Sequence, residues 1–183
     1  MHGIGPPTCS NYYNAGNRTN GVYIINPDRK GTFPVYCDQT TAGGGWTVFQ
    51  RRQDGSVDFL RGWNDYKVGF GNMKGEFWLG LEKIHRLTKA KRNKLRVELE
   101  DWKGNTAYAE YSYFEVGSEN AKYKLKGLGS YSGKPTITRQ YYKVWVHVAI
   151  FSRARNAVFV FCCVPSARLN CSVYHGRDID RKD

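Results

Sequence analysis

The residues of this chain that can do chemistry are few, and they do not converge on a catalytic pattern. Four histidines are spread along the sequence without a Gly-x-Ser-x-Gly, His-Glu-x-x-His or phosphate-loop motif. Glu98 and Glu100 fall on one face of a predicted strand, where their alternation with apolar residues favours a solvent-exposed pair over an acid–base pair. His85 lies beside an apolar residue and is interpreted as a packed or surface histidine. The sequence therefore indicates a binding protein and no enzyme.

The cysteines supply the main covalent constraint, and their number, five, leaves one unpaired if the others are bridged. Cys9 and Cys37 flank a polar, turn-rich stretch, and closing a loop of that size stabilises a fold by about 3 kcal/mol. We therefore pair Cys9 with Cys37, which requires an oxidising compartment. Cys162 and Cys163 lie in an apolar run, where a buried thiol is the default, and neither they nor Cys171 is given a partner.

The chain is basic, with 28 Lys and Arg against 16 Asp and Glu and a formal net charge of +12. Much of the excess falls in residues 134–183 and in residues 83–96, where no acidic residue intervenes. Such a surface attracts heparan sulfate, acidic glycans or nucleic acid, although a charge run is more often a solvated helix face. No zinc-finger, RNA-binding or basic-zipper motif is present, so we expect no nucleic-acid partner. The candidates for polyanion binding are Lys83, Arg86, Lys89, Lys91, Arg92 and Lys94.

Two N-glycosylation sequons are present, and Asn17-Arg-Thr is a better candidate than Asn170-Cys-Ser because it fits a surface loop. Residues 1–7 contain no apolar core of a signal peptide. The apolar stretch 144–164 is interrupted at 152–156, and neither half reaches the roughly 20 residues of a membrane-spanning helix. We expect no membrane span.

The elements that must position these residues are short strands, tight turns and two short helices. Aromatic residues make up 15% of the chain and Gly is frequent, which suits an antiparallel sheet better than a helical bundle. Apolar residues at helical spacing predict helices at 59–66 and 75–87, and Gly43 to Gly45 predict a tight turn with positive φ. Strands are predicted at 22–25, 33–37, 46–50, 93–100, 106–116 and 122–126. The tryptophans assigned to the core are Trp46, Trp63, Trp78 and Trp102. Together these features predict an α+β fold.

Several long blocks in the first two thirds of the chain resemble the fibrinogen C-terminal domain, a family that includes fibrinogen chains, tenascins, ficolins and angiopoietins. They occur in family order, and the longest is Gly-Gly-Gly-Trp-Thr-Val-Phe-Gln-Arg-Arg-Gln-Asp-Gly-Ser-Val-Asp-Phe at 43–59. The other blocks are at 21–25, 35–38, 69–72, 75–85 and 95–102. The resemblance implies a small N-terminal subdomain, a central twisted antiparallel sheet with short helices, a Cys9–Cys37 disulfide and extracellular binding without catalysis.

The resemblance stops after residue 133, and it divides the chain into three parts. We expect residues 1–8 to be irregular, residues 9–133 to form an incomplete fibrinogen C-terminal-like domain, and residues 134–183 to be a divergent tail of low order. In the tail, 144–151 and 157–164 are predicted to pair as a hairpin. Residues 172–180 resemble the segment that enters the calcium loop of the family, so Asp178 and Asp180 are the candidate calcium ligands. Since Ca²⁺ takes about six to eight oxygen ligands, two carboxylates are too few for a site, which favours a solvated tail.

The leading hypothesis is a secreted, extracellular recognition module of matrix or innate-immune type. It binds a glycan or protein ligand, usually as one arm of an oligomer formed through upstream regions. One alternative is a truncated or mis-spliced product, interrupted by an insertion or intron, that lacks the calcium and ligand subdomain. The other is a heparin-binding adhesion module acting through residues 83–96. Calcium is the cofactor that the resemblance implies.

Overall fold

The computed structural model describes residues 5–101, 104–134 and 167–174 of the chain. The helices are α1 (Cys9–Asn14), α2 (Trp63–Val68) and α3 (Leu81–Ala90), with 3₁₀ turns η1 (Thr41–Gly43) and η2 (Glu119–Ala121). The strands are β1 (Gly21–Ile25), β2 (Phe33–Asp38), β3 (Trp46–Arg52), β4 (Phe70–Gly71), β5 (Phe77–Trp78), β6 (Lys94–Asp101), β7 (Thr106–Tyr111), β8 (Phe114–Val116), β9 (Leu125–Leu128), β10 (Tyr131–Lys134) and β11 (Ala167–Tyr174).

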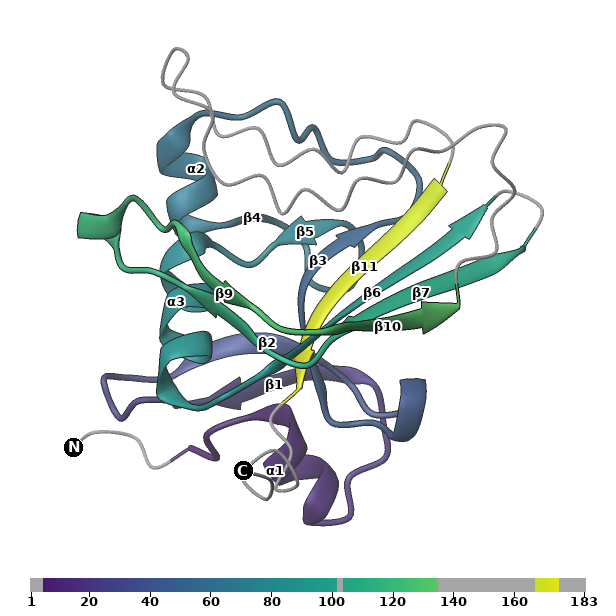
Figure 1. Ribbon diagram of the computed structural model, residues 1–183, viewed down its shortest axis with the longest axis horizontal. Coiled ribbons are helices and arrows are strands. Elements are labelled where there is room, and N and C mark those ends of the chain that lie inside the picture. The colour runs from purple at the N-terminus through teal and green to yellow at the C-terminus, as the bar shows by residue number, and fades with distance from the viewer. Residues whose placement is uncertain (1–4, 102–103, 135–166, 175–183) are drawn as a thin grey trace.

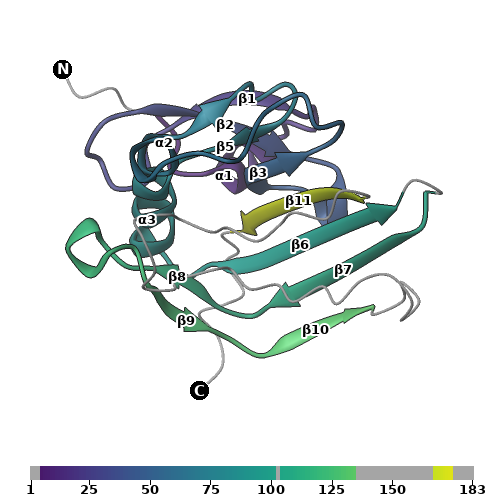
Figure 2. The same cartoon turned by 90° about the horizontal axis from the view of Figure 1, so that it is seen from above.

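Most strands join one antiparallel sheet in the order β1-β2-β3-β11-β6-β7-β10, with β5 paired to β3 and β4 to β5. β8 and β9 form a separate two-stranded ladder. In Figure 1, α1 lies beside the β1–β2 hairpin, while α2 and α3 stand one above the other at the side where β4 and β9 begin. Figure 2 shows the long strands curling away from these helices. The fold is therefore α+β, as the sequence predicts.

β11 lies in the centre of the sheet, between β3 and β6. It pairs with β6 along its whole length, from Ala167 opposite Asp101 to Tyr174 opposite Lys94, and with β3 across a bulge between Cys171 and Ser172. A strand in this position supplies ladder hydrogen bonds to two neighbours that would otherwise be open edges. The division predicted at residue 133 is therefore wrong for residues 167–174. The predicted hairpin at 144–164 lies outside the described residues.

Both predicted helices are shorter and begin later than expected. Phe59 and Leu60 precede α2 in irregular chain, where Leu60 is 85% exposed. Phe77 belongs to β5, and α3 starts only after Gly80. Gly80 has a φ of 109°, and a Cβ there would lie 2.4 Å from the carbonyl oxygen of Val68, so a sharp turn replaces helical backbone. The apolar spacing reflects a shared core and not one continuous helix.

The strand predictions hold with two corrections. The strands near 22–25, 33–37, 46–50 and 93–100 are confirmed. The strand predicted at 106–116 is two strands, because the chain leaves the large sheet where the Phe114 N–H bonds to the carbonyl of Asn93. The strand predicted at 122–126 is displaced to β9, since Lys122 and Tyr123 form a turn with φ of 55° and 50°. Gly43, Gly44 and Gly45 all have the predicted positive φ.

The core between the sheet and the helices is built mainly from aromatic rings. Phe49 stacks on Phe114 with ring centroids 5.9 Å apart and meets the edge of Trp78 at 5.9 Å. Leu95 and Val97 of β6 close the same core and are fully buried. Each such side chain contributes about 1.5–3 kcal/mol of hydrophobic stabilisation. Trp46 is also buried and Trp63 is half-buried, which confirms their core assignment, whereas Trp102 lies outside the described residues.

Candidate functional site

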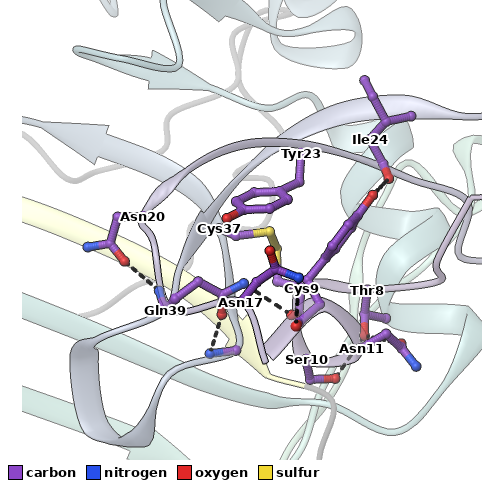
Figure 3. Close-up of a disulfide and its surroundings, with 12 residues drawn as sticks. Thr8, Cys9, Ser10, Asn11, Asn17, Asn20, Tyr23, Ile24, Cys37 and Gln39 are labelled. Atoms are coloured by element: carbon purple, nitrogen blue, oxygen red, sulfur yellow. Dashed lines mark hydrogen bonds between the residues drawn. A yellow bond between two sulfur atoms is a disulfide. The ribbon is translucent and has the colours of Figure 1, made fainter. Parts of the chain in front are cut away.

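The Cys9–Cys37 disulfide joins α1 to β2, which confirms the predicted pairing (Figure 3). Both cysteines are fully buried, and their Cα atoms are 5.4 Å apart. Around the bridge, the Gln39 side chain donates a hydrogen bond to the Cys9 carbonyl and accepts one from the Gly45 N–H. The bridge therefore fixes α1 and the glycine turn against the start of the sheet.

Asn17 lies on the exposed segment between α1 and β1, where a glycan could be attached without displacing core residues. Its side-chain amide donates a hydrogen bond to the Tyr12 carbonyl at 3.3 Å. Glycosylation of Asn17 stays a prediction. Asn170 occupies the middle of β11, opposite Glu98 of β6 and Arg51 of β3.

A hollow of about 440 Å³, named here the polar hollow, opens on one face of the large sheet. Its volume falls within the range of about 300–1,000 Å³ that is typical of ligand sites. Residues of β2, β3, β6 and β7 contribute to it, and the described lining residues are Asn20, Tyr36, Asp38, Arg51, Arg52, Gln53, Arg96, Glu98, Leu99, Glu100, Thr106, Ala107 and Tyr108.

The register of the sheet explains why these residues meet. Arg51 is opposite Asn170, which is opposite Glu98, which is opposite Tyr108. Directly opposite residues of antiparallel strands project to the same face, so the register brings Glu98 of β6 and Tyr108 of β7 to the face on which Arg51 of β3 also lines the hollow. The polar residues of β6 therefore gather with those of β3 and β7, which no local pattern in β6 reveals.

Arg96 is held inside the polar hollow by two carboxylates and a ring. Its guanidinium donates to Glu98 Oε1 at 2.8 and 2.9 Å and to Glu110 Oε1 at 2.5 Å, and it lies 4.2 Å from the Tyr108 ring centroid. Burial acts to lower the pKa of Arg96, but the hydrogen bonds to Glu98 and Glu110 outweigh it and raise that pKa. Arg96 is only 8% exposed, and Glu98 and Glu100 are half-buried. The expectation that this face of the strand is simply solvent-exposed is therefore wrong.

Arg51 is the cation of the polar hollow that has no carboxylate partner within the described residues. Its guanidinium lies 3.8 Å from the Tyr36 ring centroid, and one nitrogen donates a long hydrogen bond, 3.4 Å, to the Met73 carbonyl. The stacking holds the guanidinium plane in place. Its remaining N–H groups have no partner among the described residues. No motif in the sequence marks Arg51, because its importance depends on which residues the neighbouring strands place beside it.

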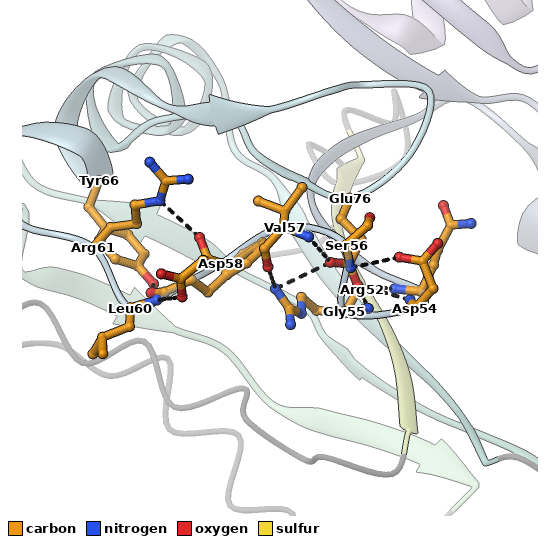
Figure 4. Close-up of polar contacts among 12 residues, drawn as sticks. Arg52, Asp54, Gly55, Ser56, Val57, Asp58, Leu60, Arg61, Tyr66 and Glu76 are labelled. Carbon is orange, nitrogen blue, oxygen red and sulfur yellow. Dashed lines mark hydrogen bonds and ion pairs between the residues drawn. The ribbon is translucent and has the colours of Figure 1, made fainter.

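Glu76 fixes the loop that borders the polar hollow, and no motif marks it either (Figure 4). It is 1% exposed and accepts hydrogen bonds from four backbone N–H groups, those of Gln53, Asp54, Gly55 and Val57, at 2.6–3.0 Å. Burial acts to raise the pKa of Glu76, but these N–H groups lower it below its ordinary value. Arg52 lies 3.5 Å from the same carboxylate. A buried glutamate next to glycine carries no local signal of this role.

The six predicted polyanion ligands divide into two groups in the structure. Arg86 forms a two-pronged ion pair with Asp28 at 2.6 and 3.0 Å, and Lys83 donates to the carbonyls of Val68 and Leu79. Burial and the neighbouring Arg86 lower the pKa of Lys83, and the bond from Arg86 outweighs burial to lower the pKa of Asp28. The other four cations lie at or after the end of α3: Lys89, Lys91 and Arg92 are exposed, and Lys94, at the start of β6, is half-buried. One continuous patch of six, as predicted, is therefore not formed.

Histidine, cysteine, aspartate and glutamate side chains are the candidate metal ligands of the described ranges. There, no group of three or more His, Cys, Asp or Glu side chains is placed to hold a metal ion. His85 is nearly buried, with Nδ1 2.9 Å from the Val116 carbonyl oxygen, as a packed histidine would be. Asp178, Asp180, Cys162 and Cys163 lie outside the described residues, so the calcium site stays a prediction. None of the described helices has the length and apolarity to span a bilayer.

Comparisons with known proteins agree with this architecture. Residues 6–176 match the model of the C-terminal globular domain of fibrinogen beta and gamma chains. Human fibroleukin is 49% identical over 140 residues, which is 76% of this chain and 32% of fibroleukin. The fibrinogen-like globe domain of human ANGPTL2 superposes with a TM-score of 0.68 at 45% identity, over 70% of this chain and 60% of that domain. Lamprey fibrin D-dimer, solved with the peptide Gly-His-Arg-Pro-amide, gives 0.67 at 36% identity, over 78% of this chain and 45% of that one.

The chain thus spans about a third of human fibroleukin, and the family match continues through β11 to residue 176. The match includes the disulfide, the polar hollow and the central strand β11, which belongs to the segment predicted to be a divergent tail. This chain belongs to the family of the fibrinogen C-terminal globular domain.

Proposed function

We propose that this chain is an extracellular, non-catalytic recognition module that binds a polar ligand, a glycan or a protein segment, in the polar hollow. The observation that carries the proposal is Arg51, a half-buried cation whose plane is fixed on Tyr36 and whose charge no described carboxylate neutralises. A half-buried cation without a partner is costly, so a ligand oxygen that reaches it gains a strong, charge-assisted hydrogen bond.

The other charged groups of the polar hollow are already engaged, which leaves Arg51 as the anchor. Arg96 is neutralised by Glu98 and Glu110, and Asp38 accepts hydrogen bonds from the backbone of Thr40 and Thr41. Burial acts to raise the pKa of Asp38, but these bonds lower it, so Asp38 stays ionised as part of a turn. Uncharged polar side chains on the rim, among them Gln53 and Thr106, suit hydroxyl and amide groups of a ligand.

The extracellular assignment rests on the buried disulfide, since such bridges persist in oxidising compartments. The lamprey fibrin relative supports ligand binding by the family, because that structure is a complex with a short peptide. Asp178 and Asp180 are the candidate calcium ligands of this proposal. A ligand whose binding depends on calcium would require them, which the comparison with and without a chelator tests.

The test is binding of the full chain to immobilised glycans, including N-acetylated sugars, and to a peptide library, each with Ca²⁺ and with a chelator. Arg51→Ala should remove binding, whereas Arg61→Ala should preserve it, because Arg61 is exposed and lies outside the polar hollow. Binding that survives Arg51→Ala would place the ligand elsewhere. Failure of folded protein to bind either library would refute a recognition function, and loss of binding with chelator would support the calcium ligands.

A further inference from the structure

The arginines and lysines of the described chain play different roles. Seven arginines lie over aromatic rings, and these pairs are Arg18–Tyr13, Arg51–Tyr36, Arg52–Phe59, Arg61–Phe70, Arg86–Phe33, Arg92–Tyr113 and Arg96–Tyr108. A guanidinium stacked on a ring covers apolar surface as well as carrying charge. The charge available to a large external anion therefore comes mainly from exposed lysines, with a smaller contribution from a stacked arginine that stays exposed, such as Arg92.

The end of α3 gathers exposed lysines on a fixed piece of backbone. Lys89 and Lys91 flank Ala90, the last residue of α3, and both are exposed. Asn93, which is fully buried, places its side-chain nitrogen within hydrogen-bond distance of the carbonyls of Leu87, Thr88 and Lys91. The bond from the Phe114 N–H to the Asn93 carbonyl ties this turn to β8, which lies beside α3 (Figure 2).

No acidic side chain competes for this turn within residues 83–96. The glutamates on either side of this run are engaged elsewhere: Glu82 accepts a hydrogen bond from the Tyr123 hydroxyl at 2.7 Å, and Glu98 accepts two from the Arg96 guanidinium. Arg92 lies over Tyr113, whose hydroxyl donates to Glu115, and Glu115 in turn lies 3.8 Å from Lys126. Lys89 and Lys91 make no such contact among the described residues, and both are exposed, so their charge is directed to solvent.

We propose that Lys89, Lys91, Arg92 and Lys94, named here the basic turn, bind a sulfated polysaccharide. A polymer that repeats sulfate groups along its length can meet several cations of a preformed turn at once, and each contact releases counterions. Single-stranded nucleic acid is disfavoured because Arg92 already covers the ring of Tyr113, which would otherwise be a platform for a base. The buried disulfide indicates an extracellular setting, where sulfated polysaccharides are available. The basic turn shares no residue with the polar hollow, so the two sites bind independently.

The test is the salt dependence of heparin binding by the full chain. The double variant Lys89→Gln, Lys91→Gln should lower the slope of log affinity against log salt by about two units, one for each lost contact. The matched control is Lys30→Gln, Lys74→Gln, which removes the same charge from exposed sites outside the basic turn and should leave the slope unchanged. Lys83→Gln, from the same basic run, should also leave it unchanged, because Lys83 is engaged with backbone carbonyls.

Three outcomes would overturn the proposal. The first is an equal loss in the control pair, which would show that only net charge matters. The second is unaltered heparin binding by the Lys89 and Lys91 double variant, with melting temperatures showing that all variants are folded. The third is duplex DNA or desulfated heparin binding as tightly as heparin with the same lysine dependence. Arg51→Ala should not change heparin binding, so a failure of this proposal is distinguishable from a failure of the polar hollow.

Discussion

Replacing Glu76 by glutamine should destabilise the chain far more than an ordinary loss of one charge. Oε1 of Glu76 accepts three backbone N–H groups and Oε2 accepts that of Val57. Glutamine keeps one acceptor oxygen, but an NH₂ group replaces the other. That NH₂ group must face either the Val57 N–H or the three N–H groups of Gln53, Asp54 and Gly55, and neither can donate to it. One buried N–H left unpaired costs about 1–3 kcal/mol, and hydrogen bonds to a charged acceptor are stronger than those to a neutral one. The combined loss is about 3 kcal/mol, reduced from the full sum because most of the 53–57 loop is exposed and can be hydrated.

The assay is thermal unfolding of wild type and Glu76→Gln from neutral to acid pH. A loss of about 3 kcal/mol in a chain of this size lowers the melting temperature by about 6–12 °C. Because the folded-state pKa of Glu76 lies below that of the unfolded chain, its stabilisation is complete above about pH 4.3 and is lost as the pH falls through the folded-state value. The difference between the two proteins should therefore shrink in acid. Amide hydrogen exchange should accelerate at Gln53, Asp54, Gly55 and Val57.

The control for this experiment is Glu119→Gln. Glu119 pairs with Lys67 at 2.5 Å, but both side chains are substantially exposed, so its loss should cost less than about 1 kcal/mol. A melting temperature of Glu76→Gln no lower than that of Glu119→Gln would refute the reasoning. So would a difference between wild type and Glu76→Gln that stays constant down to acid pH.

Three further predictions concern the scaffold around the polar hollow. Replacing Cys9 and Cys37 by serine should lower the free energy of unfolding by about 3–4 kcal/mol, as chemical denaturation would measure, because the bridge closes a loop of 28 residues; a loss equal to that caused by reductant alone is the consistency check. Gly69→Ala should destabilise by about 2–4 kcal/mol, since Gly69 has a φ of 103° and a Cβ would lie 2.4 Å from a backbone oxygen, whereas Gly62→Ala, with open space around it, should be nearly neutral; equal melting temperatures would contradict this. Arg86→Ala should cost about 1–3 kcal/mol by breaking its half-buried ion pair, and Arg86→Lys should restore only part, because ammonium cannot form the two-pronged contact; full rescue by lysine in the same melts would show that charge alone is needed.

The sequence by itself determined the α+β class, the disulfide, most strand positions and the family. These follow from local patterns: alternation in residues 93–100, the glycine turn at 43–45, and cysteines that flank a turn-rich loop. Such patterns report which face of a segment is apolar and where the chain must turn, and those properties survive into the fold because burial of apolar surface decides them.

Only the tertiary structure decided where the polar residues meet. Arg51, Glu98 and Tyr108 come from different strands and come to line one hollow through the strand order and register, with β11 inserted between β3 and β6. The basic run shows the same limit: Lys83 and Arg86 are engaged by partners that precede them by up to 58 residues, while Lys89 and Lys91 are left to solvent. A one-dimensional pattern records charge and periodicity, but the pairing of a charge depends on contacts between segments far apart in the chain, and these form only when the sheet and helices pack together.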